Sequence, residues 1–273
     1  MEKKETRLSV KLCESAMMIA LATILSLFKL VDLPYGGSIT FASMLPILLI
    51  AYRYGTAWGL FTGFVHGVLQ LVLSTSTLSY VTGAASVAAV IILDYLAAFA
   101  LIGLGGLCRG IKDQRKALAL GAVIACVLRY VCHVISGATV WAGLSIPTAG
   151  ALAYSFAYNA TYMLPELIIL VIAGFYIGSA IDFRTPRLSA YKKDGDAVSI
   201  PSIVCGALFS AALVFDVASV FGCLQDGETG EFDITGIANV NWIAVAAVTA
   251  AAVVIAAVFY AVWRQVKASG KKD

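Results

Sequence analysis

The stretch RYVCHVISGATVW, Arg129 to Trp141, lies inside an apolar segment that runs over about residues 116–143. Every fourth position carries a distinctive side chain: Arg129, His133, Gly137 and Trp141. Each step of four residues turns a helix by about 40° and climbs about 6 Å, so these residues follow one slowly drifting stripe. An arginine in mid-membrane costs about 2.5–3.5 kcal/mol on insertion scales. We therefore expect the stripe to face the protein interior as one wall of a small-molecule pocket.

The composition around this stretch is that of a membrane protein. Hydrophobic residues make up 60% of the chain and charged residues 13%, and the mean hydropathy is +0.90. Eight apolar stretches are long enough, or nearly so, to cross about 30 Å of hydrocarbon. They cover residues 12–31, 39–53, 57–74, 82–107, 117–143, 150–181, 199–222 and 239–263. The predicted fold class is an all-α integral membrane protein.

The basic residues predict the orientation of these spans. With the amino terminus in the cytoplasm, the inner segments hold 17 of the 19 Lys and Arg residues, and only Lys29 and Arg129 fall elsewhere. This distribution obeys the positive-inside rule. Both termini are therefore predicted to be cytoplasmic, and the net charge of +3 requires no nucleic-acid partner.

Motifs of catalysis and of ATP binding are missing from the chain. It has no G-x-x-x-x-G-K-[ST], H-E-x-x-H or G-x-S-x-G motif, and its only histidines are His66 and His133. The six cysteines include no C-x-x-C pair. We expect no enzymatic activity, no metal and no cofactor, and any ATP-derived energy has to come from a partner.

Several intramembrane residues have both a structural and a functional interpretation. Asp94 and Arg129 lie at similar distances from the outer ends of their spans, so the two form either an ion pair or separate ligand contacts. His66 is either an interhelical hydrogen bonder or a ligand contact. Ala16 and Ala20 permit close helix approach, within the chain or with a partner. The loop Asp32 to Thr40 is either a plain turn or a cover for a pocket.

The sixth apolar stretch adds a polar helix face. Asn159, Tyr162 and Glu166 follow one another at i, i+3 and i+7, which is one side of a helix. Glu166 lies at a depth similar to that of Arg129 and has the opposite charge. We therefore expect Glu166 to pair with Arg129.

The motifs YGG…PILL, DYLAAF…GLCRG, RYVCHVISGATVW and AYSFAYN follow in this order on successive spans. They resemble the thiamine-specific substrate-binding (S) component of energy-coupling factor (ECF) importers, the ThiT/YuaJ family, over roughly residues 10–185. In that family six helices enclose the vitamin, and a transmembrane coupling protein with two cytoplasmic ATPases drives transport. The resemblance implies a six-helix binding domain, at residues 12–185, whereas the additional helix pair at residues 199–264 has no counterpart in the family. The charge pattern predicts a cytoplasmic N-terminus, a cytoplasmic linker and a cytoplasmic tail at residues 1–11, 186–198 and 265–273.

The resemblance also implies roles for individual residues. It assigns the substrate contacts to Asp94, Tyr95, Arg129, His133, Gly137, Trp141, Tyr154 and Asn159, and docking on the coupling protein to Ala16 and Ala20. Arg129 stands where the family usually has lysine. Aromatic faces suit the flat rings and the cation of thiamine, and a carboxylate offsets its charge.

Three positions depart from the family pattern. Gly37 and Phe41 stand where the family has a tryptophan and a glutamate, and His66 stands where it has a tryptophan. We count these three residues, with Tyr162 and Glu166, as possible additional pocket residues. The departures keep open a related pyrimidine or thiazole compound, or another vitamin, as the ligand.

We predict a high-affinity, non-enzymatic binding subunit for thiamine uptake in the bacterial plasma membrane. The alternative from another class is a proton-coupled secondary transporter that uses Asp94, His66 and Glu166 as proton relays.

Overall fold

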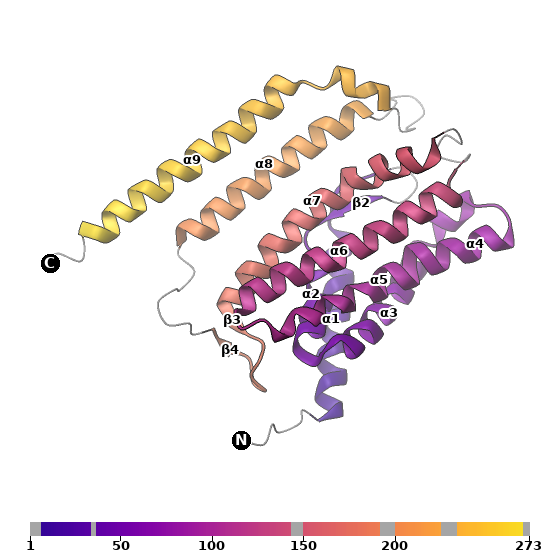
Figure 1. The fold of residues 1–273 in the computed structure, drawn as a ribbon, viewed down its shortest axis with the longest axis horizontal. Helices are drawn as coiled ribbons and strands as arrows, with labels where there is room; N and C mark the ends of the chain where they lie inside the picture. The colour runs from indigo at the N-terminus through magenta and orange to yellow at the C-terminus, as the bar shows by residue number, and fades with distance from the viewer. Residues whose placement is uncertain (1–6, 34–36, 143–149, 192–199, 225–233, 270–273) are drawn as a thin grey trace. The chain divides into compact units, whose positions relative to one another are not determined.

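A computed structural model describes residues 7–33, 37–142, 150–191, 200–224 and 234–269 (Figure 1). The chain divides into two compact units, Met1–Tyr191 and Lys192–Asp273. Parts of the predicted cytoplasmic ends and linker, residues 1–6, 192–199 and 270–273, lie outside the described residues.

The first unit consists of helices and two short antiparallel hairpins, β1 with β2 and β3 with β4. Its elements, in chain order, are α1 (Leu8–Leu27), β1 (Lys29–Asp32), β2 (Ser38–Thr40), α2 (Leu45–Tyr54), α3 (Thr56–Leu73), η2 (Thr75–Tyr80), α4 (Ala84–Val90), η3 (Ile91–Ala97), α5 (Ala98–Ala100), η4 (Leu101–Gly110), α6 (Gln114–Thr139), α7 (Ala151–Ala180), β3 (Ile181–Asp182) and β4 (Ser189–Ala190).

The second unit contains α8 (Ile200–Leu224), η5 (Ile234–Asn239) and α9 (Trp242–Ser269). The two long helices pack against each other. Between them, the hydroxyl of Thr249 donates a hydrogen bond to Asp216 over 2.5 Å.

The described helices confirm an all-α membrane protein, since seven of them are long and apolar enough to cross a bilayer. The apolar stretch over residues 39–53 holds a shorter helix than predicted. The helix there, α2, has 10 residues and is therefore only about 15 Å long. The stretch is shortened because residues 38–40 form strand β2, and because α2 begins only at Leu45, with Pro46 in its first turn.

The stretch between Ala84 and Gly110 changes helix type along its length. An α-helical start passes into a π-helical segment, Ile91–Ala97, and the stretch ends as a 3-10 helix, Leu101–Gly110. The apolar sequence did not predict this change. The π segment carries Asp94 and Tyr95, and such segments are frequent at functional sites.

Glycines on α3 allow it to lie very close to this irregular stretch. A Cβ atom on Gly63 would lie 2.4 Å from the carbonyl oxygen of Phe99, and one on Gly67 would lie 2.7 Å from that of Tyr95. No side chain fits at either position. The close approach brings Phe99 and Tyr95 beside Gly63 and Gly67, in the interior of α3.

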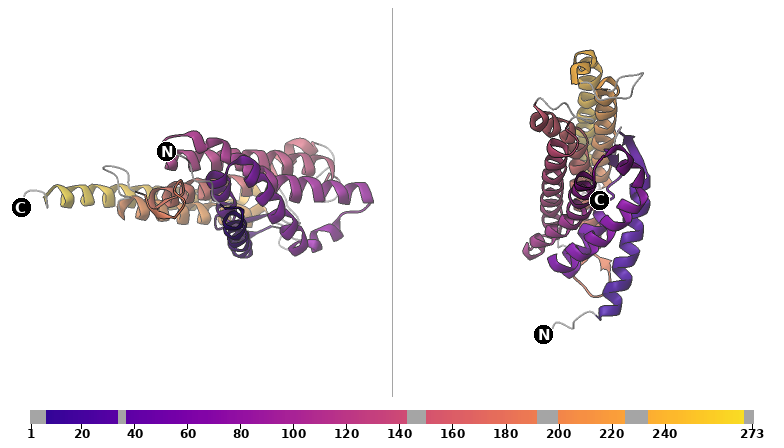
Figure 2. Two further views of the ribbon diagram at one scale, coloured as in Figure 1. Left: turned by 90° about the horizontal axis from the view of Figure 1, so that it is seen from below. Right: turned by 90° about the vertical axis from the view of Figure 1, so that its right-hand side faces the viewer.

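Helices α6 and α7 form the most extensive contact of the first unit and lie side by side (Figures 1 and 2). Near one end of this pair, the buried Gln114 side chain donates to the carbonyls of Gly178 and Ile181 and accepts from the amide of Phe183. A second contact lies toward the other end, where the hydroxyl of Ser155 donates to the carbonyl of Val134. These bonds set the register in which α6 and α7 present their polar residues.

Candidate substrate-binding site

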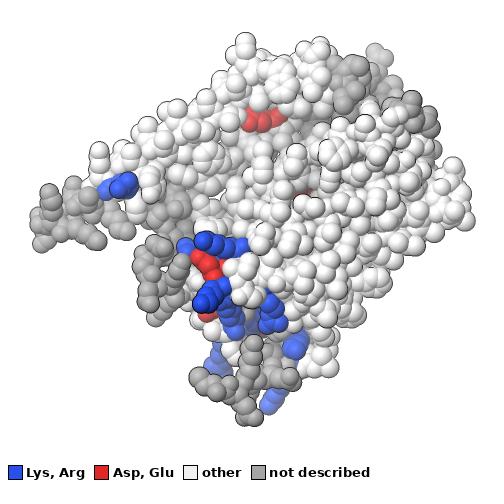
Figure 3. Space-filling model, viewed as in Figure 1, with Lys and Arg blue, Asp and Glu red and all other residues white. Residues whose placement is uncertain are grey.

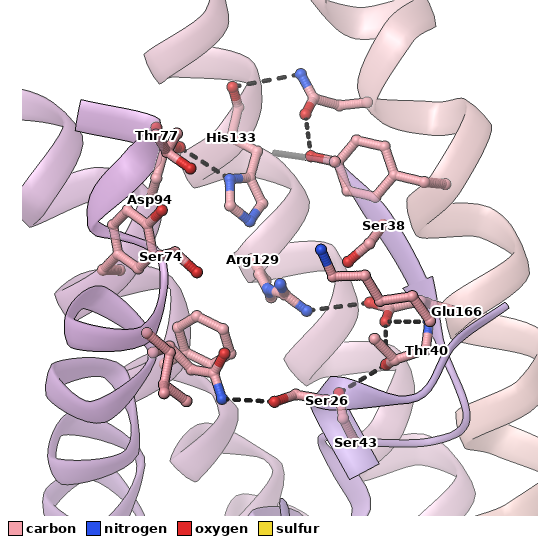
Figure 4. Close-up of a pocket in the computed structure, with 18 of the residues that line it drawn as sticks. Ser26, Ser38, Thr40, Ser43, Ser74, Thr77, Asp94, Arg129, His133 and Glu166 are labelled. Atoms are coloured by element: carbon pink, nitrogen blue, oxygen red, sulfur yellow. Dashed lines mark hydrogen bonds and ion pairs between the residues drawn. The ribbon is translucent and has the colours of Figure 1, made fainter. Parts of the chain in front are cut away.

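A cavity of about 240 Å³ lies in the first unit between α6, α7, the η3 and α5 segments, the β1–β2 hairpin and the end of α3 (Figure 4). This volume is near the lower end of the range for small-molecule sites. Ten of the predicted site residues line it: Gly37, Asp94, Tyr95, Arg129, His133, Gly137, Trp141, Asn159, Tyr162 and Glu166. The structure therefore brings most of the sequence candidates to one space.

Asp94 forms one polar centre of the cavity. One carboxylate oxygen lies 2.8 Å from Nδ1 of His133, and the other accepts from the hydroxyl of Ser136 at 2.6 Å and from Nε1 of Trp141 at 3.3 Å. Asp94 does not pair with Arg129, so the first of the two interpretations of these charges is wrong. The π-helical segment instead presents its carboxylate to the carboxy-terminal part of α6.

Arg129 and Glu166 form the second polar centre. Nη1 of Arg129 lies 3.0 Å from Oε2 of Glu166, which confirms the predicted pair. Oε1 of Glu166 accepts from the Thr40 hydroxyl at 2.6 Å and from the Thr40 amide at 3.2 Å. Glu166 thus joins α6, α7 and strand β2 (Figure 4).

Two buried nitrogen atoms of α6 have no hydrogen-bond partner among the described residues. They are Nε of Arg129 and Nε2 of His133. Both belong to side chains that line the cavity. Unsatisfied buried nitrogens are costly in a folded protein and are typical of places where a ligand or a water molecule completes the bonding.

Aromatic side chains also line the cavity. Those that line it are Tyr95, Phe99, Trp141, Tyr158 and Tyr162. The guanidinium of Arg129 lies 4.6 Å from the centre of the Phe99 ring, and Tyr162 meets His133 edge to face, with ring centres 6.2 Å apart. Such surfaces suit a flat, cationic ligand.

Asn159 connects the α7 side of the site to α6. Its amide nitrogen donates to the carbonyl of Ser155 at 2.8 Å and to that of His133 at 3.4 Å. Its amide oxygen accepts from the hydroxyl of Tyr162 at 2.5 Å. Asn159 therefore has a donor and an acceptor at the cavity wall, both engaged within the protein.

Gly37 belongs to the hairpin that covers part of the cavity. A Cβ atom there would lie 2.9 Å from Leu33, and 3.2 Å from both Tyr158 and Tyr162. The position therefore has no room for a tryptophan. The two tyrosines of α7 fill that space with aromatic surface.

Sequence reasoning missed a wall of small polar side chains. These are Ser26, Ser38, Thr40, Ser43, Gln70, Ser74, Ser76 and Thr77, and Lys29 also lines the cavity. They come from the end of α1, the hairpin, the end of α3 and η2. A signal existed only for Gln70, which lies four residues after His66 and so on the same helix face.

Three candidates do not line the cavity: His66, Phe41 and Tyr154. His66 is fully buried, lies 3.5 Å from the Thr23 hydroxyl, and packs edge to face on Phe99. Phe41 is 57% exposed. On α1, Ala16 and Ala20 are exposed, and the buried residues of that helix are Ser15 and Ala22.

Comparison with known proteins agrees with this arrangement. The family model described as thiamine transporter protein (Thia_YuaJ) matches residues 12–182. The thiamine transporter ThiT of Bacillus subtilis (strain 168) is 34% identical over 175 residues, which cover 60% of this chain and 87% of that protein. ThiT of Lacticaseibacillus paracasei is 26% identical over 211 residues, which cover 70% and 94%.

A solved structure shows the same fold. ThiT from Listeria monocytogenes superposes with a TM-score of 0.51 at 23% identity, and the match covers 62% of this chain and 93% of that chain. The matched part is smaller than this chain, which has 273 residues.

Proposed function

Because this chain belongs to the thiamine transporter (ThiT/YuaJ) family, we propose that it is the non-enzymatic membrane subunit that binds thiamine for uptake. Delivery across the membrane then depends on an ATP-driven ECF module. The observation that carries the proposal is one cavity in which two carboxylates, an unpartnered imidazole nitrogen and aromatic faces surround a space for one small molecule.

The Asp94–His133 pair suits the aminopyrimidine ring of thiamine. A neutral imidazole that donates from Nδ1 to Asp94 leaves Nε2 as an acceptor. The hydrogen bond to Asp94 assigns this tautomer. The exocyclic amine of the pyrimidine supplies the donor that Nε2 lacks.

The charges and aromatic faces suit the thiazolium ring. Asp94 lines the cavity without a Lys or Arg partner among the described residues, and its carboxylate favours a permanent cation. Rings such as those of Tyr95, Trp141 and Tyr162 attract a cation and cover a flat heterocycle. No metal ion or cofactor is needed for this non-covalent capture.

Transport requires partners in the proposal, namely the transmembrane coupling protein and two cytoplasmic ATPases. The exposed Ala16 and Ala20 on α1 offer a small-residue surface for the coupling protein. Lys and Arg gather at one end of the first unit, where α1 begins and α7 ends (Figure 3). We assign this basic end to the cytoplasm of a bacterial plasma membrane, with both termini on that side.

Titration of the detergent-purified chain with thiamine tests the binding function. We expect saturable quenching of tryptophan fluorescence at submicromolar thiamine, and a loss of that quenching in Trp141→Phe. The pyrimidine and thiazole fragments are titrated in parallel. A response to one fragment and not to thiamine would overturn the assignment of the ligand.

Uptake into vesicles tests the transport mechanism separately. We expect the chain to take up labelled thiamine only when a coupling protein, two ATPases and ATP are present. Uptake by the chain alone, driven by a proton gradient, would instead establish a secondary transporter.

A further inference from the structure

Glu166 is an unusual residue for the middle of a membrane helix. It lies near the centre of α7, and its side chain is 3% exposed. A carboxylate in such a place needs compensation, and residues of this kind usually serve function. Its compensation comes from one cation, Arg129, and from the hydroxyl and amide of Thr40.

The cavity is balanced in charge because of Glu166. The described residues that line it include two cations, Lys29 and Arg129, and two carboxylates, Asp94 and Glu166. These four formal charges cancel. Loss of the Glu166 charge makes the lining of the cavity more positive by one unit.

The charge balance bears on which form of the ligand the site prefers. Resting on the proposed function, we propose that Glu166 is the specificity residue that makes the site select the thiamine cation over its phosphate monoester. Thiamine carries one positive charge, whereas the monoester adds close to two negative charges at neutral pH. Without Glu166, Arg129 attracts the phosphate and repels the cation.

The low polarity of the surroundings strengthens this effect. Arg129 packs on Phe99, and its side chain is only 13% exposed. Charges in such a site interact far more strongly than in water, and salt screens them less. A change of one charge at Glu166 therefore shifts the affinities of the two ligands in opposite directions.

The test is the ratio of two dissociation constants, for thiamine and for thiamine monophosphate, on the purified full-length chain. If a substitution distorts the pocket and weakens both ligands equally, the ratio of the two dissociation constants stays the same. We expect Glu166→Gln to shift the ratio toward the monophosphate by about tenfold or more. Arg129→Gln is expected to shift the ratio toward thiamine. The double variant is expected to have a ratio close to that of the native chain.

Thr40→Val is the matched control. It removes the hydroxyl that donates to Glu166 and keeps every charge in the cavity. A weaker affinity for both ligands with an unchanged ratio is expected. The same result for Glu166→Gln would overturn the proposal, because Glu166 would then act only by holding strand β2.

Three further outcomes keep the test decisive. If Glu166→Gln does not fold, the ratio for Arg129→Gln carries the test, and a ratio that stays at the native value overturns the proposal. If the native chain binds neither ligand, the proposed thiamine function fails. Native binding of thiamine with a ratio that no charge change moves leaves that function standing and refutes the role of Glu166.

Discussion

Two arginines of the first unit, Arg53 and Arg129, each meet a carboxylate in a sheltered place. Arg53 lies 2.7 Å from Glu14 and Arg129 lies 3.0 Å from Glu166, and the two arginine side chains are 6% and 13% exposed. All three guanidinium nitrogens of Arg53 donate hydrogen bonds. Its other acceptors are the Tyr54 hydroxyl and the carbonyls of Phe183, Thr185 and Pro186.

Arg129 is bonded far less completely. Its Nη1 contacts Glu166 and the sulfur of Met44, and its buried Nε has no partner among the described residues. The two ion pairs are similar in length, so the difference lies in the bonding that surrounds them. The fully hydrogen-bonded guanidinium of Arg53 holds chain segments together. The guanidinium of Arg129 lies beside the cavity with a nitrogen that can still donate a hydrogen bond to a ligand.

Asp94→Asn is expected to have the largest effect, and it tests whether the charged groups of the cavity serve ligand binding. The change removes the charge that holds His133 in its tautomer and that balances a bound cation. We expect the affinity for thiamine to fall by about a hundredfold or more, as for other buried charge partners. Isothermal titration calorimetry measures it.

Asp216→Asn provides the control for that change. Asp216 lies on α8 of the second unit and accepts a hydrogen bond from Thr249. The affinity is expected to stay within twofold. An equal loss of affinity in both variants would show that the charge of Asp94 has no special role in binding.

Arg53→Gln tests whether the fully hydrogen-bonded arginine serves stability and not binding. Several carbonyls and the Glu14 carboxylate lose their donor, so we expect the free energy of unfolding to fall by about 2–3 kcal/mol. The affinity for thiamine is expected to change less than twofold. Thermal unfolding in detergent and a thiamine titration on the same sample measure both quantities.

Arg109→Gln is the matched variant for Arg53. Arg109 is exposed and makes one long bond, of 3.4 Å, to the Arg53 carbonyl. Its replacement should leave the unfolding temperature nearly unchanged. If Arg53→Gln weakened binding as much as Asp94→Asn does, the contrast between the two arginines would not hold.

Gly37→Val gives the smallest expected effect. It tests how the β1–β2 hairpin affects Arg129 through Glu166. The new side chain would collide with Leu33 and with the tyrosines of α7. It would displace the hairpin and with it Thr40, which bonds to Glu166. We expect the affinity for thiamine to fall about tenfold, from lost packing and lost positioning.

Gly110→Ala is the control for the hairpin change, because a Cβ atom on Gly110 meets nothing within 4 Å. It should bind thiamine as the native chain does. Native affinity in Gly37→Val would show that the hairpin does not shape the site.

Much of the fold and part of the site were predictable from the sequence. Hydropathy located the long spans, and the spacing of Arg129, His133 and Gly137 placed them on the cavity wall. Depth and opposite charge identified the pair of Arg129 with Glu166. These inferences succeed because helix periodicity and the cost of burying a charge act locally on each span.

Other features depended on how the spans rotate and approach one another. The sequence permitted an Asp94–Arg129 pair, but Asp94 meets His133, Ser136 and Trp141. The sequence predicted a loop at residues 32–40 but not the pairing of β1 with β2, and it carried no clear signal for the short α2 or the π-helical segment. Apart from Gln70, the small polar side chains that line the cavity also had no sequence signal, because they come from separate elements of the chain.

The sequence by itself therefore determined the class of the protein, its family and the α6 face that carries the site. The tertiary structure alone decided which polar groups are satisfied and which remain open. The reason is physical: a span buries its apolar surface in lipid wherever it lies, whereas a hydrogen bond requires two particular atoms within about 3 Å. Only the packing of α3, α6, α7 and the hairpin provides that geometry.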